Sequence, residues 1–184
     1  EDTAKLYTDL GLLTTDIRIT QDIAEFFNVI TGHSMPTHYE HLITAPRDMR
    51  NRLIEMIEHE VDNHKAGLPA GICWKINSLQ DTLTMEALYR ASQAGVPVLL
   101  IIRGICCLRP QRKGLSENIY IKSIVGNYLE HTRIFYFHNN EIAKSITLQG
   151  QDLIKFSIRA VNHYFQHKWH LDTELHEKLG IAGR

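Results

Sequence analysis

The sequence has few cysteines, no excess of charge of either sign, and no long apolar run. Its three cysteines, Cys73, Cys106 and Cys107, cannot all pair, so we expect a reducing, cytoplasmic compartment rather than a disulfide framework. Twenty Lys and Arg against 21 Asp and Glu give a net charge of −1, which excludes bulk attraction to nucleic acid. The longest apolar run, residues 96–102, is far shorter than the ~20 residues of a membrane-spanning helix.

The composition that is present is typical of a folded globular chain. Hydrophobic residues make up 43% of it and charged residues 22%, which excludes an intrinsically disordered or low-complexity sequence. Its length of 184 residues favours one domain with part of a second. Because the sequence begins at Glu1 in an extended-looking stretch, we expect it to be a piece of a larger protein.

Hydrophobic periodicity predicts alternating helices and strands. Apolar residues recur at helical spacing in residues 20–30, 46–66 and 81–94, and Thr20 is the expected N-cap of the first helix. Apolar runs predict strands at 72–76, 96–102, 119–125 and 133–137, with a short helical turn at 127–130. A strand, helix and strand joined by short connections favour parallel pairing, so we predict an α/β fold with a mixed or parallel sheet flanked by helices.

The segment between the first two helices has little periodicity. It contains Pro36 and three histidines, which indicates a connection between two packed units and places a boundary near residue 41. We therefore expect residues 1–41 to end one domain and residues 42–140 to form a second. Residues 141–184 are expected to form a helical tail without an assigned role.

Three polar residues are expected at the carboxyl ends of neighbouring strands, where open α/β sheets bind ligands. Arg103 follows one strand and suits a phosphate, or it is an edge arginine paired with a carboxylate. Lys75 and Asn77 lie two residues apart, so they share a face at the end of the preceding strand. The alternative for Lys75 is a side chain that reaches solvent from a strand at the sheet edge.

Two other residues have both a chemical and a structural interpretation. His131 precedes the last predicted strand and can move protons near neutral pH, or it is a structural hydrogen-bonding residue. Tyr7 either stacks on a nucleobase or fills a core. His163 and His167, one helical turn apart, are suited to a metal but also fit a surface helix, and no metal-site residue is assigned.

Several stretches resemble one family. They are residues 4–14 (AKLYTDLGLLT), 88–96 (LYRASQAGV), 102–110 (IRGICCLRP), 114–119 (GLSENI) and 123–137 (SIVGNYLEHTRIFYF). These stretches are similar to the carboxy-terminal catalytic region of bacterial polyphosphate kinase. The resemblance runs from residue 1 to about residue 140 and implies a phospholipase-D-like fold in two related catalytic domains.

The resemblance also implies an activity and roles for single residues. Members of the family transfer the terminal phosphate of ATP reversibly onto inorganic polyphosphate through a phosphohistidine, with Mg²⁺. By motif, Tyr7 would contact ATP, Arg103 the nucleotide phosphates, and His131 the transferred phosphate, where it would assist proton transfer. Lys75 and Asn77 would be further phosphate contacts. The family further implies a homo-oligomer, and for some members an association with the inner face of the membrane.

Two departures from the family pattern limit what this sequence is expected to do alone. The nucleophilic histidine and the magnesium ligands of the family lie upstream of the residues present, so we expect the isolated chain to be inactive. After residue 140 the family's further phosphate-binding segment is not apparent. Two alternatives therefore stay open: a phospholipase-D-like phosphodiesterase, since His131 and Arg133 resemble a His-x-Lys signature, and a non-catalytic module that binds nucleotide or polyphosphate.

Overall fold

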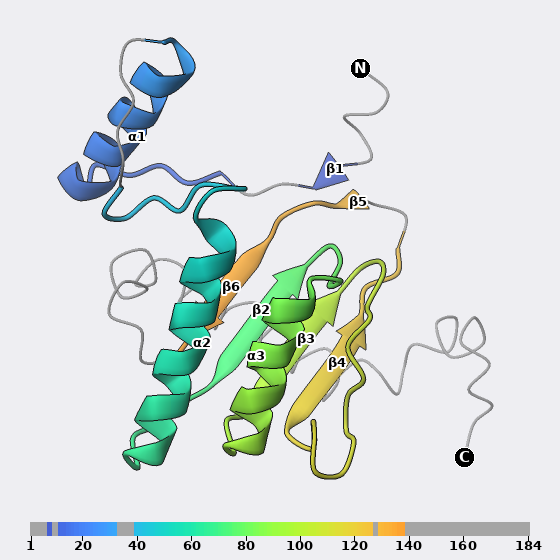
Figure 1. Cartoon of the computed structure of the whole chain (residues 1–184). Coiled ribbons are helices and arrows are strands. Elements are labelled where there is room, and N and C mark those ends of the chain that lie inside the picture. Colours follow the sequence, from blue (N-terminus) through green and yellow to red (C-terminus); the bar gives the residue numbers. More distant parts are fainter. Residues whose placement is uncertain (1–6, 9–10, 33–38, 127–128, 139–184) are drawn as a thin grey trace, which may run out of the picture. The chain divides into compact units, whose positions relative to one another are not determined.

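The computed structural model describes residues 7–8, 11–32, 39–126 and 129–138 (Figure 1). The predicted tail at 141–184, with His163 and His167, lies outside the described residues. Of the segment 127–130 expected as a helical turn, residues 129–130 are described and form a short strand.

A four-stranded sheet forms the centre of the described fold. Its strands are β2 (Ile72–Ile76), β3 (Val98–Ile102), β4 (Ile119–Ser123) and β6 (Ile134–Phe137), in the spatial order β4-β3-β2-β6. The first three are parallel, and β6 runs antiparallel to β2. The predicted α/β class with a mixed sheet is therefore confirmed.

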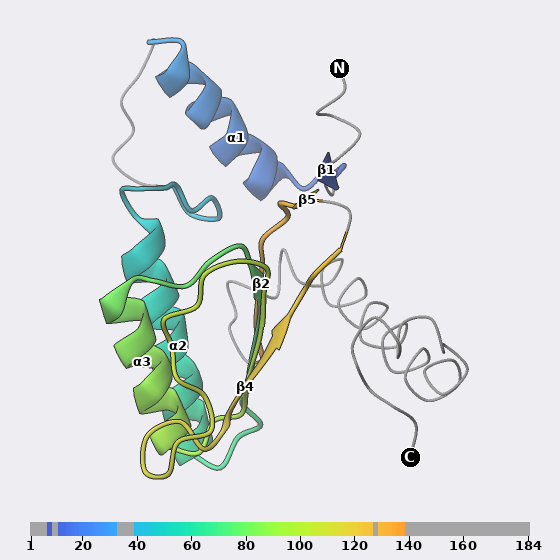
Figure 2. The same ribbon diagram turned by 90° about the vertical axis from the view of Figure 1, so that its right-hand side faces the viewer.

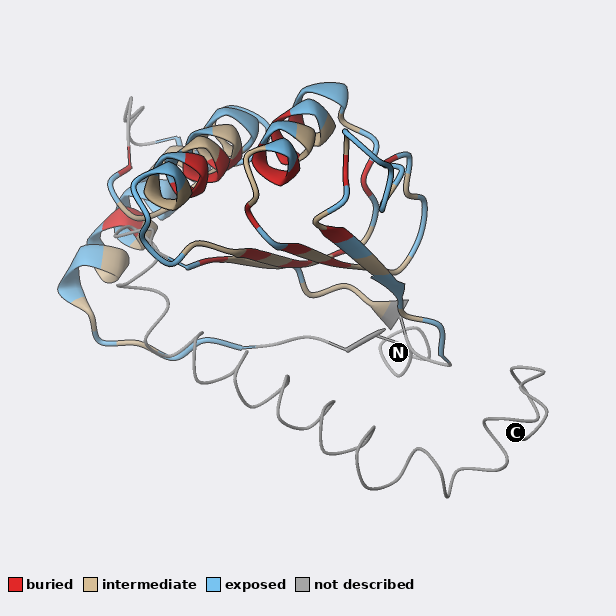
Figure 3. Ribbon diagram, turned by 90° about the horizontal axis from the view of Figure 1, so that it is seen from below, coloured by how far each residue is buried: buried red, intermediate tan, exposed pale blue. Residues whose placement is uncertain are grey.

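Two helices cover one face of this sheet. Helix α2 (Met49–Lys65) and helix α3 (Thr82–Gln93) lie side by side on that face (Figure 2). Their apolar stripes are buried, as Figure 3 shows in red, and they pack with alternate residues of the strands. The buried strand residues include Trp74, Leu100 and Phe137, all at most 2% exposed.

The order of strand, helix and strand follows from local signals. Asp81 caps α3 because its side chain accepts a hydrogen bond from the backbone N–H of Thr84 (3.0 Å). Gly95 follows the C-cap of α3 with a φ of 99°, a backbone conformation that favours glycine. The chain then returns to form β3 in parallel with β2, as predicted.

Helix α1 (Ile17–Ile30) differs from its prediction in two respects. Its N-cap is Asp16, not Thr20, because the Asp16 carboxylate accepts from the backbone N–H of Arg18 (3.0 Å). The helical spacing of apolar residues in this segment also predicts a buried face, and this is wrong within the described residues, since Phe27 and Ile30 are 56% and 59% exposed. Periodicity locates a helix, but it does not supply the surface against which the helix packs.

The buried residue of α1 is polar. The Asp22 carboxylate accepts hydrogen bonds from the backbone N–H groups of residues 40, 41 and 42, across the connection. Burial of the carboxylate opposes ionisation, but these three donors outweigh it and hold the pKa of Asp22 below its usual value.

In the ranges that the structure describes, no helix is long and apolar enough to cross a membrane.

The packing of α3 against the sheet can be tested with two leucines of the same helix. Leu88 is fully buried and Leu83 is 51% exposed. We expect Leu88→Ala to lower the free energy of unfolding by about 2–5 kcal/mol, because it leaves a cavity under the helix. Leu83→Ala is expected to change it by less than about 0.5 kcal/mol. Urea denaturation measures both, and equal losses would contradict this placement of α3.

Candidate functional site

The candidate site lies at the edge of the sheet where the parallel strands end, with Asn77 directly after β2 and Arg103 directly after β3. The two strands remain hydrogen-bonded beyond their ends. The backbone N–H of Arg103 donates to the carbonyl of Ile76 (3.2 Å), and that of Gly104 donates to the carbonyl of Asn77 (2.7 Å). Asn77 and Arg103 are therefore neighbours, as the strand-end argument predicts.

Gly104 permits this close approach of the two backbones. A Cβ atom at position 104 would lie 3.0 Å from the carbonyl oxygen of Asn77 and 3.1 Å from Oγ of Ser78. Both distances are shorter than ordinary van der Waals contact. A glycine after Arg103 thus keeps the two polar residues at one point of the edge.

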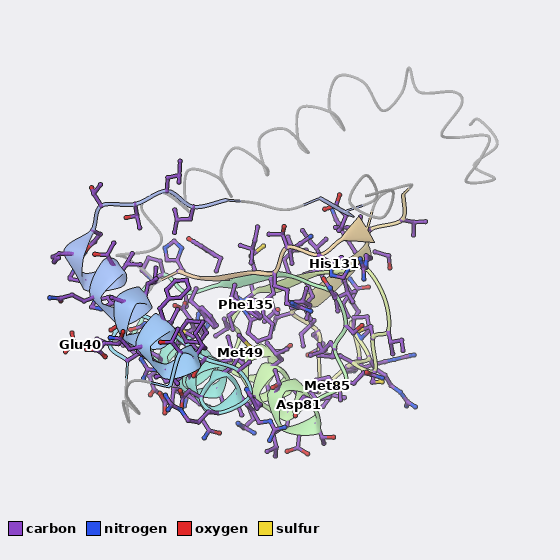
Figure 4. All side chains as sticks on the ribbon, turned by 90° about the horizontal axis from the view of Figure 1, so that it is seen from above. Glu40, Met49, Asp81, Met85, His131 and Phe135 are labelled. Atoms are coloured by element: carbon purple, nitrogen blue, oxygen red, sulfur yellow. The ribbon has the colours of Figure 1, made fainter. Side chains whose placement is uncertain are left out.

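His131 reaches the same edge from a different direction. It lies between β5 (Leu129–Glu130) and β6, and because β6 is antiparallel, its start lies where the parallel strands end. Nδ2 of Asn77 is 3.4 Å from Nδ1 of His131. Figure 4 looks onto this edge and shows His131 beside the strands, while Asp81 and Met85 belong to the helix layer.

Lys75 is engaged by the chain around His131. Its ammonium group donates to the carbonyl oxygens of Glu130 (3.3 Å) and Thr132 (2.7 Å). It also lies 3.4 Å from Oε2 of Glu130, and its side chain is 14% exposed. Since β2 lies between β3 and β6, the alternative of a lysine that reaches solvent from an edge strand is wrong.

Arg103 carries a buried donor with no protein partner in the described part of the chain. Its Nη1 atom makes no hydrogen bond there, and Oδ1 of Asn77 is likewise buried and unpaired. Among the described ranges no ion pair involves Arg103, so the alternative of an arginine paired with a carboxylate is not supported. A buried guanidinium nitrogen without a partner is suited to an anionic ligand.

Tyr7 approaches this region through its backbone. Strand β1 (Tyr7–Thr8) pairs in parallel with β5, with Tyr7 opposite Leu129 and Thr8 opposite Glu130. The N-terminal segment therefore joins the strand that leads directly to His131. This pairing, between residues more than 120 positions apart, is a contact that the sequence does not predict.

The described part of this edge presents cations rather than metal ligands. Glu130 is paired with Lys75, and no group of three or more His, Cys, Asp or Glu side chains suited to a metal occurs in the described ranges. These residues alone therefore do not fit a Mg²⁺ site. Cys73 lies on the same strand, but burial raises the pKa of its thiol and so disfavours the nucleophilic thiolate.

Glu130 belongs to the site and is not predicted from the sequence. A charged residue inside the apolar stretch of β2 is a signal that Lys75 needs a partner, because burial of an unpaired ammonium is costly. The carboxylate that meets it lies 55 positions further along the chain, immediately before His131. The signal is present, but the identity of the partner depends on the antiparallel return of β6.

Comparison with known proteins shows what this chain is similar to. A family model described as polyphosphate kinase C-terminal domain 2 matches residues 42–164, and one described as C-terminal domain 1 matches residues 1–36. Polyphosphate kinases of Staphylococcus haemolyticus and Synechocystis are 51% and 53% identical over 138 and 137 residues. These alignments cover 75% and 74% of this chain and 19% of each relative, so the chain spans about a fifth of their length.

A solved structure supports the same relationship at the level of the fold. The crystal structure of polyphosphate kinase from Porphyromonas gingivalis matches with a TM-score of 0.63 and 39% sequence identity, over 70% of this chain and 21% of that one. The predicted phospholipase-D-like architecture is confirmed by this likeness. From the two family models and these relatives, together with the sheet they share, we conclude that the chain belongs to the polyphosphate kinase family, within its carboxy-terminal region.

Proposed function

We propose that this chain contributes the phosphate-binding part of a polyphosphate kinase active site. The observation that supports it most directly is the buried, unpaired guanidinium nitrogen of Arg103 beside Asn77, which in turn faces His131. The reaction is the reversible transfer of the terminal phosphate of ATP onto inorganic polyphosphate. Its ligands are ATP, ADP and the phosphate polymer.

Arg103 and His131 would act on the transferred phosphate. Phosphoryl transfer depends mainly on positioning and on positive charge around the phosphate oxygens, which the guanidinium supplies. The imidazole can donate a hydrogen bond to a phosphate oxygen or protonate a leaving oxygen near neutral pH. We propose Tyr7 as the contact to ATP. A direct phosphate contact of Lys75 and Asn77 stays a prediction, and both side chains contact the chain around His131.

The covalent step requires a nucleophilic histidine other than His131. In the proposed reaction the bond between the β- and γ-phosphates of ATP breaks and a bond from phosphorus to the histidine forms, releasing ADP. That bond then breaks as the terminal oxygen of polyphosphate attacks the phosphorus. We propose that the nucleophile and the ligands of Mg²⁺ lie outside the described residues, and that Mg²⁺ supplies charge neutralisation when bound.

We also propose a reaction class, a location and an oligomeric state for the whole protein. The relatives that match are named polyphosphate kinases, which favours the kinase over the phosphodiesterase that the His-x-Arg order suggested. We propose a cytoplasmic location and a homo-oligomer, with peripheral association at the inner face of the membrane as in some members. The predicted division into residues 1–41, 42–140 and 141–184 likewise stays a prediction.

Arg103 can be tested with a phosphate polymer as the probe. We expect Arg103→Gln to weaken binding of tripolyphosphate to the 184-residue chain by at least about tenfold, because a hydrogen bond to a charged group is lost. Arg109→Gln is the matched control, since Arg109 is exposed and its backbone contacts Tyr89 of α3. Isothermal titration calorimetry measures both affinities. Equal losses would indicate unspecific charge attraction and overturn the role of Arg103.

If the nucleophilic histidine lies upstream of the chain, as we propose, the chain alone is inert. Incubated with γ-labelled ATP and Mg²⁺, the 184-residue chain is expected to form neither acid-stable polymer nor labelled protein. A full-length relative such as the Staphylococcus haemolyticus enzyme serves as the positive control. Polymer formed by the chain itself would show that the nucleophile lies within it and contradict the proposal.

A further inference from the structure

The chain around His131 is attached to β2 by two separate contacts, one to its backbone and one to its ring. Lys75 provides the first. The two carbonyl groups that accept from its ammonium belong to Glu130 and Thr132, the residues on either side of His131. The carboxylate of Glu130 is a third partner of this ammonium, as an ion pair at 3.4 Å.

Asn77 provides the second contact, and its chemistry constrains where His131 carries its proton. The group that faces Nδ1 of His131 is the amide nitrogen of Asn77, at 3.4 Å. In this orientation of the amide, its nitrogen can donate and cannot accept a hydrogen bond, so Nδ1 is the acceptor. In the neutral imidazole the proton then resides on Nε2.

β2, which contains Lys75 and ends directly before Asn77, is well suited to hold both residues. β2 is hydrogen-bonded on both sides, to β3 and to β6, and its opposite face is packed against the helices through Trp74. Lys75 is paired in register with Ile134, the first residue of β6. The segment from Glu130 to Ile134 is thus connected to β2 by side chains at its start and by strand pairing at its end.

We infer that Lys75 and Asn77 are positioning residues for His131. Lys75 fixes the backbone on both sides of the histidine, and Asn77 fixes the ring as the tautomer with the proton on Nε2. This tautomer presents an N–H donor, rather than an acceptor, on the nitrogen remote from Asn77. The significance for phosphate transfer rests on the proposed function, whereas the tautomer and the anchoring of the backbone do not.

Asn77→Asp tests the tautomer, because a carboxylate accepts and cannot donate. In the chain labelled with ¹⁵N-histidine, we expect the signals of His131 near pH 8 to show an unprotonated Nδ1 and a protonated Nε2. In Asn77→Asp the proton is expected to move to Nδ1, where it can be donated to the carboxylate. The signals are identified by their loss in His131→Gln.

Asn51→Asp is the matched control, since Asn51 is exposed on α2 and the substitution adds the same charge. It is expected to leave the proton of His131 on Nε2. A wild-type imidazole protonated on Nδ1, or a tautomer unchanged in Asn77→Asp, would overturn the inference. If the unmodified chain carries the proton on Nε2 but does not bind tripolyphosphate, the proposed function is overturned and the tautomer is not. The two failures are therefore distinguishable.

Lys75→Met tests the backbone anchor, since it removes the ammonium and keeps an apolar side chain of similar length. We expect amide hydrogen exchange in residues 129–134 to become at least about tenfold faster, because three charged contacts are lost. Lys122→Met, at an exposed lysine of β4, is expected to leave this exchange unchanged. Unchanged exchange in folded Lys75→Met would overturn the role of Lys75.

A second variant covers the case in which Lys75→Met does not fold. Lys75→Met combined with Glu130→Gln removes both charges, so no carboxylate is left without its ion-pair partner. The same acceleration in residues 129–134 is expected, because the neutral pair cannot replace the ammonium contacts to the two carbonyls. Protection equal to that of the unmodified chain would again overturn the inference.

Discussion

The backbone hydrogen bonds between β2 and β3 continue past the last residue of each strand, and this continuity determines where the polar residues of the edge lie. The N–H groups of Arg103 and Gly104 both donate to carbonyl groups at the end of β2. Further along, the N–H groups of Leu79 and Cys107 extend the pairing. A parallel pair that separated at its ends would leave Arg103 and Asn77 free to diverge. Here their backbones are held side by side before any side-chain contact is made.

Alternate residues of β2 face opposite sides of the sheet and have different roles. In β2, Trp74 and Ile76 face the helices and are buried, while Cys73 and Lys75 face the other way and are only partly buried. The helix face supplies the apolar packing that keeps the strands in position. The opposite face can therefore carry Lys75, whose burial is compensated by its contacts to Glu130 and Thr132.

Much of this arrangement follows from sequence patterns, and the errors have identifiable causes. The apolar run at 72–76 predicts β2 to the residue, and Asp81 marks the start of α3. The predicted strand at 96–102 begins two residues too early, since the N–H of Val96 still bonds to Ala91 at the end of α3 and Pro97 has no N–H.

The site is predictable where it depends on strand direction and unpredictable where it depends on distant pairing. Parallel strands end at one edge, so Asn77 and Arg103 are expected together from sequence alone. The contacts of Lys75 join residues 55 and 57 positions apart, and no local pattern specifies such a pairing. The exposed apolar side of α1 shows the same limit, because amphipathicity defines a face and not its partner.

The reversed direction of β6 also determines which insertions the site tolerates. His131 enters the sheet at this edge, so its position is set by the pairing that follows it, from Ile134 onward. A residue gained or lost between Ser123 and Leu129 changes the length of a connection and leaves the imidazole in register with Asn77. A residue gained between His131 and Ile134 shifts the imidazole along the edge, so in the evolution of this family length variation should accumulate before the histidine and not after it.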